Sequence, residues 1–188
     1  MAERSYKCLN TDNLFIDGFE LVPIRDLDKI EIMHWRNQQI KFLRQSKLLN
    51  EEQQNHYFKT TVAALFNIEY PEQFLFSFLH NGVLCGYGGL VHINWEDRNA
   101  EISLLIKTEL EKDNFAKYWS AYLSILFKIA FEKLNFHKIY TYAFDLRPHL
   151  YEILILKGFI EEARLKQHCF YDGEYLDVLI HSKFREKC

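Results

Sequence analysis

The sequence predicts an α/β (α+β) protein with a central mixed, mostly antiparallel sheet of seven strands, flanked by about four helices. Two turn signals, Asn-Gly at 81–82 and Asp-Gly at 172–173, each separate two strand-like segments and predict β-hairpins. Residues 100–106 form an almost unbroken apolar run, which is typical of a buried strand. Residues 114–134 then carry apolar side chains at three- and four-residue spacing, which predicts a long amphipathic helix.

The composition indicates one domain over residues 1–188, and we expect residues 1–18 to form a loosely held leader. Apolar residues make up 48% of the chain, which is enough for a core and excludes a disordered chain. The net charge of −3 gives no basic excess, so we expect no nucleic-acid partner. The apolar runs are too short to cross a bilayer, so we expect no membrane partner.

The cysteines indicate a reduced protein without a metal centre. Cys8, Cys85, Cys169 and Cys188 are far apart and form no Cys-x-x-Cys pair, which argues against a zinc site and a disulfide framework. His168, beside Cys169, has no further ligands at metal spacing. Because the first residues also lack the apolar stretch of a signal peptide, we expect a cytoplasmic protein.

Each element follows from local signals. The strands are expected at residues 19–25, 74–79, 84–95, 100–106, 136–144, 159–171 and 174–184. The helices are expected at residues 28–37, 50–66, 114–134 and 148–157. Asn50 and Gln53 predict a capping box, Pro148 suits the first turn of a helix, and Gly158 suits a helix end.

The order of these elements predicts one parallel pair in the sheet. A helix separates strand 100–106 from strand 136–144, so the second strand must cross over and lie parallel to the first. Two parallel strands within a mostly antiparallel sheet can splay apart. We expect such a splay to expose backbone N–H and C=O groups that an extended ligand could pair with.

Several short stretches, in this order and spacing, resemble the GNAT acyltransferase superfamily over about residues 19–184. They are His34–Asn37, Gly86–Leu90, Asn99–Ser103, Ile129–Leu134, Lys157–Phe159 and Tyr171–Asp177. Together they look like the branch that includes ribosomal-protein and nucleotide-aminosugar acetyltransferases. Met33–Asn37 with Leu43–Gln45, and His92–Trp95 leading to Glu101, look most like aminosugar enzymes of the pseudaminic-acid type.

The resemblance implies acetyl-CoA as co-substrate, with no metal. Pantetheine is then expected along Leu104, Leu105 and Ile106, and the pyrophosphate at the helix start. That start, Lys112, Asn114, Phe115, Ala116 and Lys117, departs from the family pattern because it contains no glycine. Asn114 is the residue there best able to adopt a positive φ, whereas Glu111 and Asp113 add negative charge beside a phosphate site.

Two residues are expected to act in catalysis. Glu101 opens the central strand, where partial burial would raise its pKa towards that of a useful base; the alternative is a carboxylate at the rim paired with an arginine. The family often places its acid, a tyrosine, at the position of Leu154, and an asparagine at Arg147. Tyr151, one turn upstream, is a substitute for the acid, with simple packing as the alternative.

Arg36, Arg44 and His92 are the expected acceptor-binding residues, because a guanidinium binds phosphate in a bidentate way. The favoured function that the resemblance implies is acetyl transfer to a primary amine on a nucleotide-linked amino sugar. Acetylation of a protein N-terminus and a non-catalytic binding domain of the same fold remain alternatives. The aromatic content of 16% fits a homodimer interface as well as a core.

Overall fold

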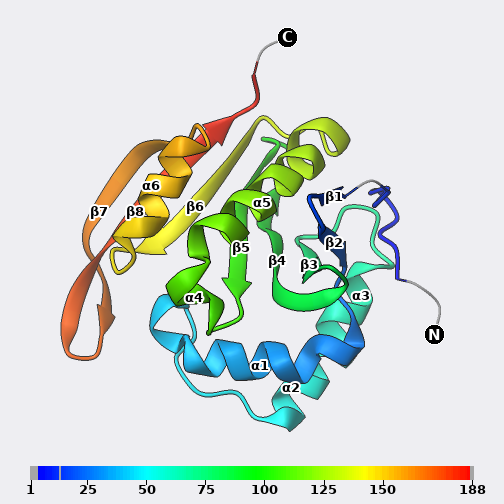
Figure 1. The fold of residues 1–188 in the computed structure, drawn as a ribbon, viewed down its shortest axis with the longest axis horizontal. Coiled ribbons are helices and arrows are strands. Elements are labelled where there is room, and N and C mark those ends of the chain that lie inside the picture. Colours follow the sequence, from blue (N-terminus) through cyan, green and yellow to red (C-terminus); the bar gives the residue numbers. More distant parts are fainter. Residues whose placement is uncertain (1–3, 13, 187–188) are drawn as a thin grey trace.

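The computed structural model describes residues 4–12 and 14–186 and contains one eight-stranded sheet in the order β1-β2-β3-β4-β5-β6-β8-β7 (Figure 1). The strands are β1 (Phe15–Ile16), β2 (Phe19–Pro23), β3 (Phe74–His80), β4 (Val83–Asn94), β5 (Asn99–Ile106), β6 (Lys138–Phe144), β7 (Ile160–Tyr171) and β8 (Glu174–Phe184). Only β5 and β6 pair in parallel among the described strands. The predicted mixed sheet is therefore confirmed, with β1 as one additional short strand.

The helices surround the splayed part of the sheet. They are α1 (Lys29–Gln38), α2 (Glu51–Tyr57), α3 (Ala63–Leu65), α4 (Leu110–Asp113), α5 (Phe115–Phe127) and α6 (Pro148–Leu156). A π-helical segment, Phe58–Val62, joins α2 to α3, and another, Lys128–Lys133, continues α5. In Figure 1, α5 and α6 lie side by side over one face of the sheet, while α1 lies below the diverging ends of β5 and β6.

The local turn and cap predictions are confirmed. Asn81 and Gly82 have φ values of 51° and 77°, so both central residues of the first hairpin turn are left-handed, as that turn requires. The Asn50 side chain accepts from the Gln53 N–H while the Gln53 side chain accepts from the Asn50 N–H, which completes the capping box. Gly158 has a φ of 81° and ends α6.

The expectation of a loosely held leader is wrong for its described part. Tyr6, Leu9 and Leu14 are buried in the core. The Tyr6 hydroxyl donates to the carbonyl of Leu75 at 2.8 Å and accepts from its N–H at 2.7 Å. These buried side chains and the hydrogen bonds of Tyr6 therefore hold the segment against β3.

β4 and β5 approach each other closely at Gly88. A Cβ atom there would lie 2.0 Å from the carbonyl oxygen of Ser103 and 2.7 Å from the hydroxyl of Tyr122. The Tyr122 hydroxyl in turn donates to the Ser103 carbonyl at 2.7 Å. The absence of a side chain at Gly88 thus allows α5 to fix the position of β5.

Among the described residues, no helix is long and apolar enough to cross a membrane, and no group of three His, Cys, Asp or Glu side chains is placed to hold a metal ion. Cys8, Cys85 and Cys169 are free thiols, whereas Cys188 lies outside the described residues.

Candidate active site

The candidate site begins where β5 and β6 separate. Their parallel pairing joins Asn99 to Lys138, Ala100 to Ile139 and Glu101 to Tyr140, and it ends there. Beyond Glu101 the edge of β5 that faces β6 has no strand neighbour, and a cavity of about 580 Å³ opens between the two strands. The predicted splay is therefore confirmed.

Four parts of the chain line this cavity. They are α1 and the segment after it with Arg36, Phe42, Leu43 and Arg44; the segment before β3 together with β4, with Glu72, Gln73, Val91, His92 and Ile93; β5 with Glu101, Ile102, Ser103 and Leu104; and the α5–β6–α6 side with Trp119, Thr141, Tyr142, Ala143, Phe144, Arg147 and Leu150. The cavity is thus shared by segments that are far apart in sequence.

Glu101 lies at the closed end of the splay, with only 6% of its surface exposed. Burial raises the pKa of its carboxyl group above the ordinary value, while the charges of Arg44 and His92 oppose that rise. Arg44 forms an ion pair with Glu101, and His92 Nε2 lies 3.9 Å from Glu101 Oε2. This environment suits a carboxylate that accepts a proton near neutral pH.

His92 reaches Glu101 because β4 is irregular at this point. Its φ is 49°, an uncommon value for a residue with a side chain, and the register of β4 against β5 shifts between Val91 and Asn94. The guanidinium of Arg44 lies 4.7 Å above the ring of Tyr142 and contacts His92 at 3.3 Å. Arg44 therefore lies across the gap between β5 and β6, from Glu101 to Tyr142.

Arg36 lines the larger cavity and also a second cavity of about 300 Å³. Both cavities are lined by Arg36, Gln73, Val91 and Ser103, so they adjoin. Arg36 Nη1 donates to the Tyr87 hydroxyl at 2.5 Å, and its Nε donates to Gln45 Oε1 at 2.9 Å. Both partners are neutral, and Arg36 forms no ion pair with a described acidic residue.

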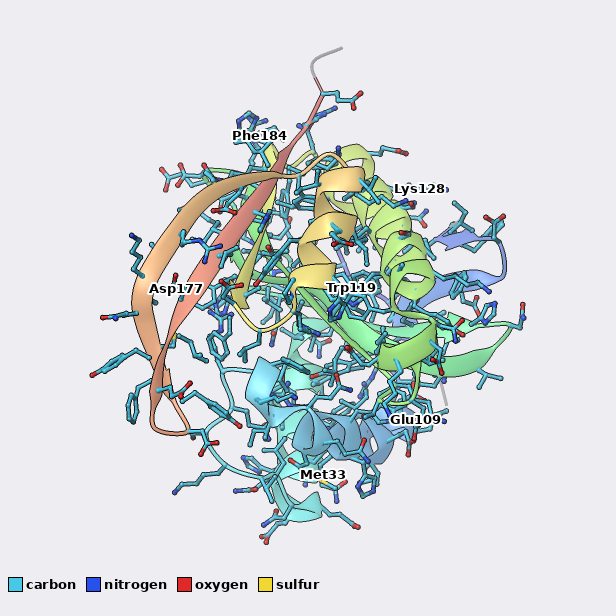
Figure 2. The ribbon with its side chains drawn as sticks, turned by 60° about the vertical axis from the view of Figure 1, so that its left-hand side comes forward. Met33, Glu109, Trp119, Lys128, Asp177 and Phe184 are labelled. Atoms are coloured by element: carbon cyan, nitrogen blue, oxygen red, sulfur yellow. The ribbon has the colours of Figure 1, made fainter. Side chains whose placement is uncertain are left out.

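Two buried polar atoms on the cavity wall lack a hydrogen-bond partner among the described residues: Trp119 Nε1 and Thr141 Oγ1. Figure 2 shows Trp119 in the middle of the molecule. Buried N–H and O–H groups without partners are costly, and they are common where a ligand supplies the missing bond. Together with the unpaired edge of β5, these atoms fit an extended, amide-containing ligand such as pantetheine.

The sequence-predicted residues fall into three groups. The cavity wall includes Glu101, Leu104, Arg36, Arg44 and His92. The remaining expected CoA residues do not line this cavity: Leu105, Ile106 and Phe115 are buried in the core, and Lys112, Asn114, Ala116 and Lys117 are exposed around the start of α5. Asn114 has a φ of −130°, so it does not take the left-handed conformation considered for it.

Tyr151 lies apart from the cavity. Its hydroxyl donates to the carbonyl of Phe144 at 3.1 Å, and its ring stacks on His181 at 5.0 Å. Leu154 is fully buried. The residues that the sequence reasoning missed are Trp119, within the expected helix 114–134, and Thr141, within the expected strand 136–144; Arg147 was noted only as a departure from a family pattern.

A family model described as "Acetyltransferase (GNAT) domain" matches residues 21–180. A spermidine N(1)-acetyltransferase of Vibrio cholerae is 33% identical over 108 residues, which cover 54% of this chain and 59% of that protein. The match thus spans little more than half the length of that curated relative.

Solved structures share the fold. A Vibrio cholerae spermidine N-acetyltransferase in complex with CoA and spermine has a TM-score of 0.79 at 20% identity, covering 90% of this chain and 97% of that one. A dodecameric structure of the same enzyme has a TM-score of 0.73 at 23% identity, covering 90% and 95%.

Proposed function

Because the chain belongs to the GNAT acetyltransferase family, we propose that it transfers an acetyl group from acetyl-CoA to a primary amine. One observation carries the proposal: the cavity between β5 and β6 has an unpaired strand edge on one wall and the buried carboxylate of Glu101 at its closed end. Acetyl-CoA supplies an activated thioester acetyl group. The remaining work of the site is positioning, proton removal and hydrogen-bond donation.

Each of these tasks has a residue to perform it. Glu101 takes the proton of the amine, since it is the buried acid among the residues that line the larger cavity. Arg44 orients the Glu101 carboxylate and keeps it ionised. Trp119 Nε1 and Thr141 Oγ1 are the donors available to an extended ligand between the strands.

The acceptor is proposed to be an amine that also carries phosphate, such as a nucleotide-linked amino sugar. The smaller cavity contains Arg36 and no acidic side chain among its lining residues. A guanidinium with only neutral partners favours an anionic ligand group, and it disfavours a polycation.

Polyamine acetylation is the second candidate. It is favoured by the 33% identity to a spermidine N(1)-acetyltransferase over 108 residues. The two candidates differ in the charge of the acceptor, because a polyamine is cationic along its whole length and a nucleotide sugar is anionic.

The deciding experiment measures binding of acetyl-CoA by calorimetry and then release of CoA thiol with a panel of amines. We expect micromolar binding, about −8 kcal/mol, and thiol release with nucleotide amino sugars. Thiol release with spermidine or spermine alone would favour the second candidate. Failure to bind acetyl-CoA at millimolar concentration would support a non-catalytic domain.

Self-association is proposed as part of the working form; the aromatic content fits a dimer interface as well as a core. The ribbon formed by β7 and β8 carries exposed Phe170 and Tyr175 near its tip. A related spermidine N-acetyltransferase is dodecameric. Light scattering on the purified protein would distinguish a dimer from a larger assembly or a monomer.

A further inference from the structure

Glu111 and Arg147, two residues at which the sequence departs from the family pattern, contact each other. Glu111 lies in α4, and Arg147 immediately precedes α6. Arg147 Nη1 lies 3.5 Å from Glu111 Oε1, and the two side chains are only 11% and 15% exposed. The acid expected to oppose phosphate binding is therefore already paired with a buried cation.

The guanidinium of Arg147 is held on the wall of the larger cavity. It lies 4.5 Å from the ring centre of Phe42 and 5.9 Å from that of Trp119, so the aromatic rings fix its position. Its one ion pair with a described acid, at 3.5 Å, is longer than a usual charge-assisted hydrogen bond, which measures about 2.7–2.9 Å. The hydrogen-bonding capacity of Arg147 is thus largely unused.

The Glu111 carboxylate is also poorly satisfied. Burial raises its pKa above the ordinary value, and Arg147 and Lys41 only partly counter that effect. Taking both charges out of water costs free energy that a single long contact repays incompletely. A ligand anion that bound Arg147 with good geometry could displace the carboxylate and let it return to water.

The surroundings of Arg147 favour such an anion. The N-termini of α5 and α6 meet here, since the ring of Phe115 lies 4.3 Å from that of His149. Helix N-termini attract anions through their free N–H groups and dipoles. The buried Trp119 Nε1, which lacks a partner among the described residues, lies beside Arg147 and is a donor for the pantetheine part of the ligand next to that anion.

We propose that the Glu111 carboxylate holds the place of a donor phosphate on Arg147, and that CoA binds by displacing it. Arg147 then supplies the phosphate contact at this glycine-free helix start. The inference rests on the proposed function, because it takes the donor to be a CoA ester. Binding of CoA then breaks the contact between α4 and Arg147.

The test compares CoA with pantetheine, which lacks phosphate, in calorimetry on the full chain. Glu111→Gln removes the competing anion, so CoA should bind about 3- to 10-fold tighter, while pantetheine binding stays unchanged. Arg147→Gln should weaken CoA binding by at least about tenfold and affect pantetheine much less. Melting temperatures of both variants are recorded to confirm that they fold. If Arg147→Gln does not fold, Arg147→Lys replaces it in the binding test, because lysine keeps the positive charge but cannot bind phosphate in a bidentate way.

Glu109→Gln is the matched control, because the Glu109 side chain is 69% exposed and pairs with Lys107. Figure 2 labels Glu109. The substitution removes the same charge two positions away from Glu111 and should leave CoA affinity unchanged. If folded Glu111→Gln binds CoA no tighter than the wild type, the place-holding role is wrong while the proposed function stands. If Glu109→Gln tightens binding equally, the effect is general electrostatics and the inference fails. If the wild type binds no CoA, the proposed function itself fails and this inference with it.

Discussion

Glu101 and Tyr140 are the last residue pair that joins β5 to β6, so the buried carboxylate lies at the point where the parallel strands separate. The same residue contacts Arg44, which comes from the segment after α1 and stacks on Tyr142 of β6. The sheet, the connecting segment and the cavity wall thus meet at one acid. This position makes Glu101 the first target for mutation.

Glu101→Gln should lower kcat by about 100-fold or more at neutral pH, because the amide cannot accept the amine proton. Acetyl-CoA binding should change little. Glu72→Gln is the matched control, since Glu72 lines the same cavity but is exposed. Steady-state kinetics and calorimetry on both variants check the prediction. Equal turnover of wild type and Glu101→Gln would remove Glu101 as the base.

Arg44→Gln should move the acid limb of the rate–pH profile to higher pH. Arg44 lowers the pKa of Glu101 against the effect of burial, so its removal lets that pKa rise further. Catalysis needs the ionised carboxylate of Glu101. As the pH falls, the variant should therefore lose activity at a higher pH than the wild type does. His92→Gln, which removes a partner at 3.9 Å, should shift the profile in the same direction but less.

The same linkage predicts a change in stability. The folded-state pKa of Glu101 is raised, so its contribution to stability is full below the unfolded-state pKa and is lost as pH rises through the folded-state value. Arg44→Gln should enlarge that loss. Urea unfolding at several pH values across the acid range measures it; a pH-independent difference between Arg44→Gln and wild type would contradict the linkage.

Sequence patterns predicted those parts of the fold that depend on neighbours in the chain. The turns at 81–82 and 172–173 and the capping box at Asn50 each follow from residues within three positions. The splay was also predictable, because a helix between two strands forces a parallel connection. Tyr6 was not, because its hydroxyl bonds to Leu75, 69 positions away.

The site was predicted less fully for the same reason. Glu101, Arg44 and His92 were identified, but their mutual contacts join residues up to 57 positions apart and could not be read from spacing. Trp119 has the periodicity of a core residue, and it is one; only the fold shows that its N–H lies on a cavity wall without a partner. Likewise, nothing local indicates that Glu111 lies against Arg147.

Tyr151→Phe should leave turnover within about twofold of the wild type. The hydroxyl donates to the Phe144 carbonyl and lies off the cavity, and burial raises its pKa, so the phenol stays protonated. Loss of that bond should cost about 1 kcal/mol of stability. Steady-state kinetics measures the effect on turnover, and urea unfolding measures the effect on stability. A large fall in kcat with unchanged stability would instead identify Tyr151 as the proton donor.

Trp119→Phe should weaken CoA and pantetheine binding by a similar factor, about three- to tenfold, without lowering the free energy of unfolding. The indole N–H is buried and has no partner among the described residues, so removing it relieves an unsatisfied donor in the free protein. The phenyl ring can still pack against Phe115 and Arg147. Calorimetry with both ligands checks the predicted loss of affinity, and urea unfolding checks the predicted stability.

Trp119→Leu, which loses the aromatic contacts as well, should reduce stability, and this difference between the two variants separates packing from hydrogen bonding. If Trp119→Phe binds both ligands as the wild type does, the N–H does not face the donor and another group on this wall must hold it.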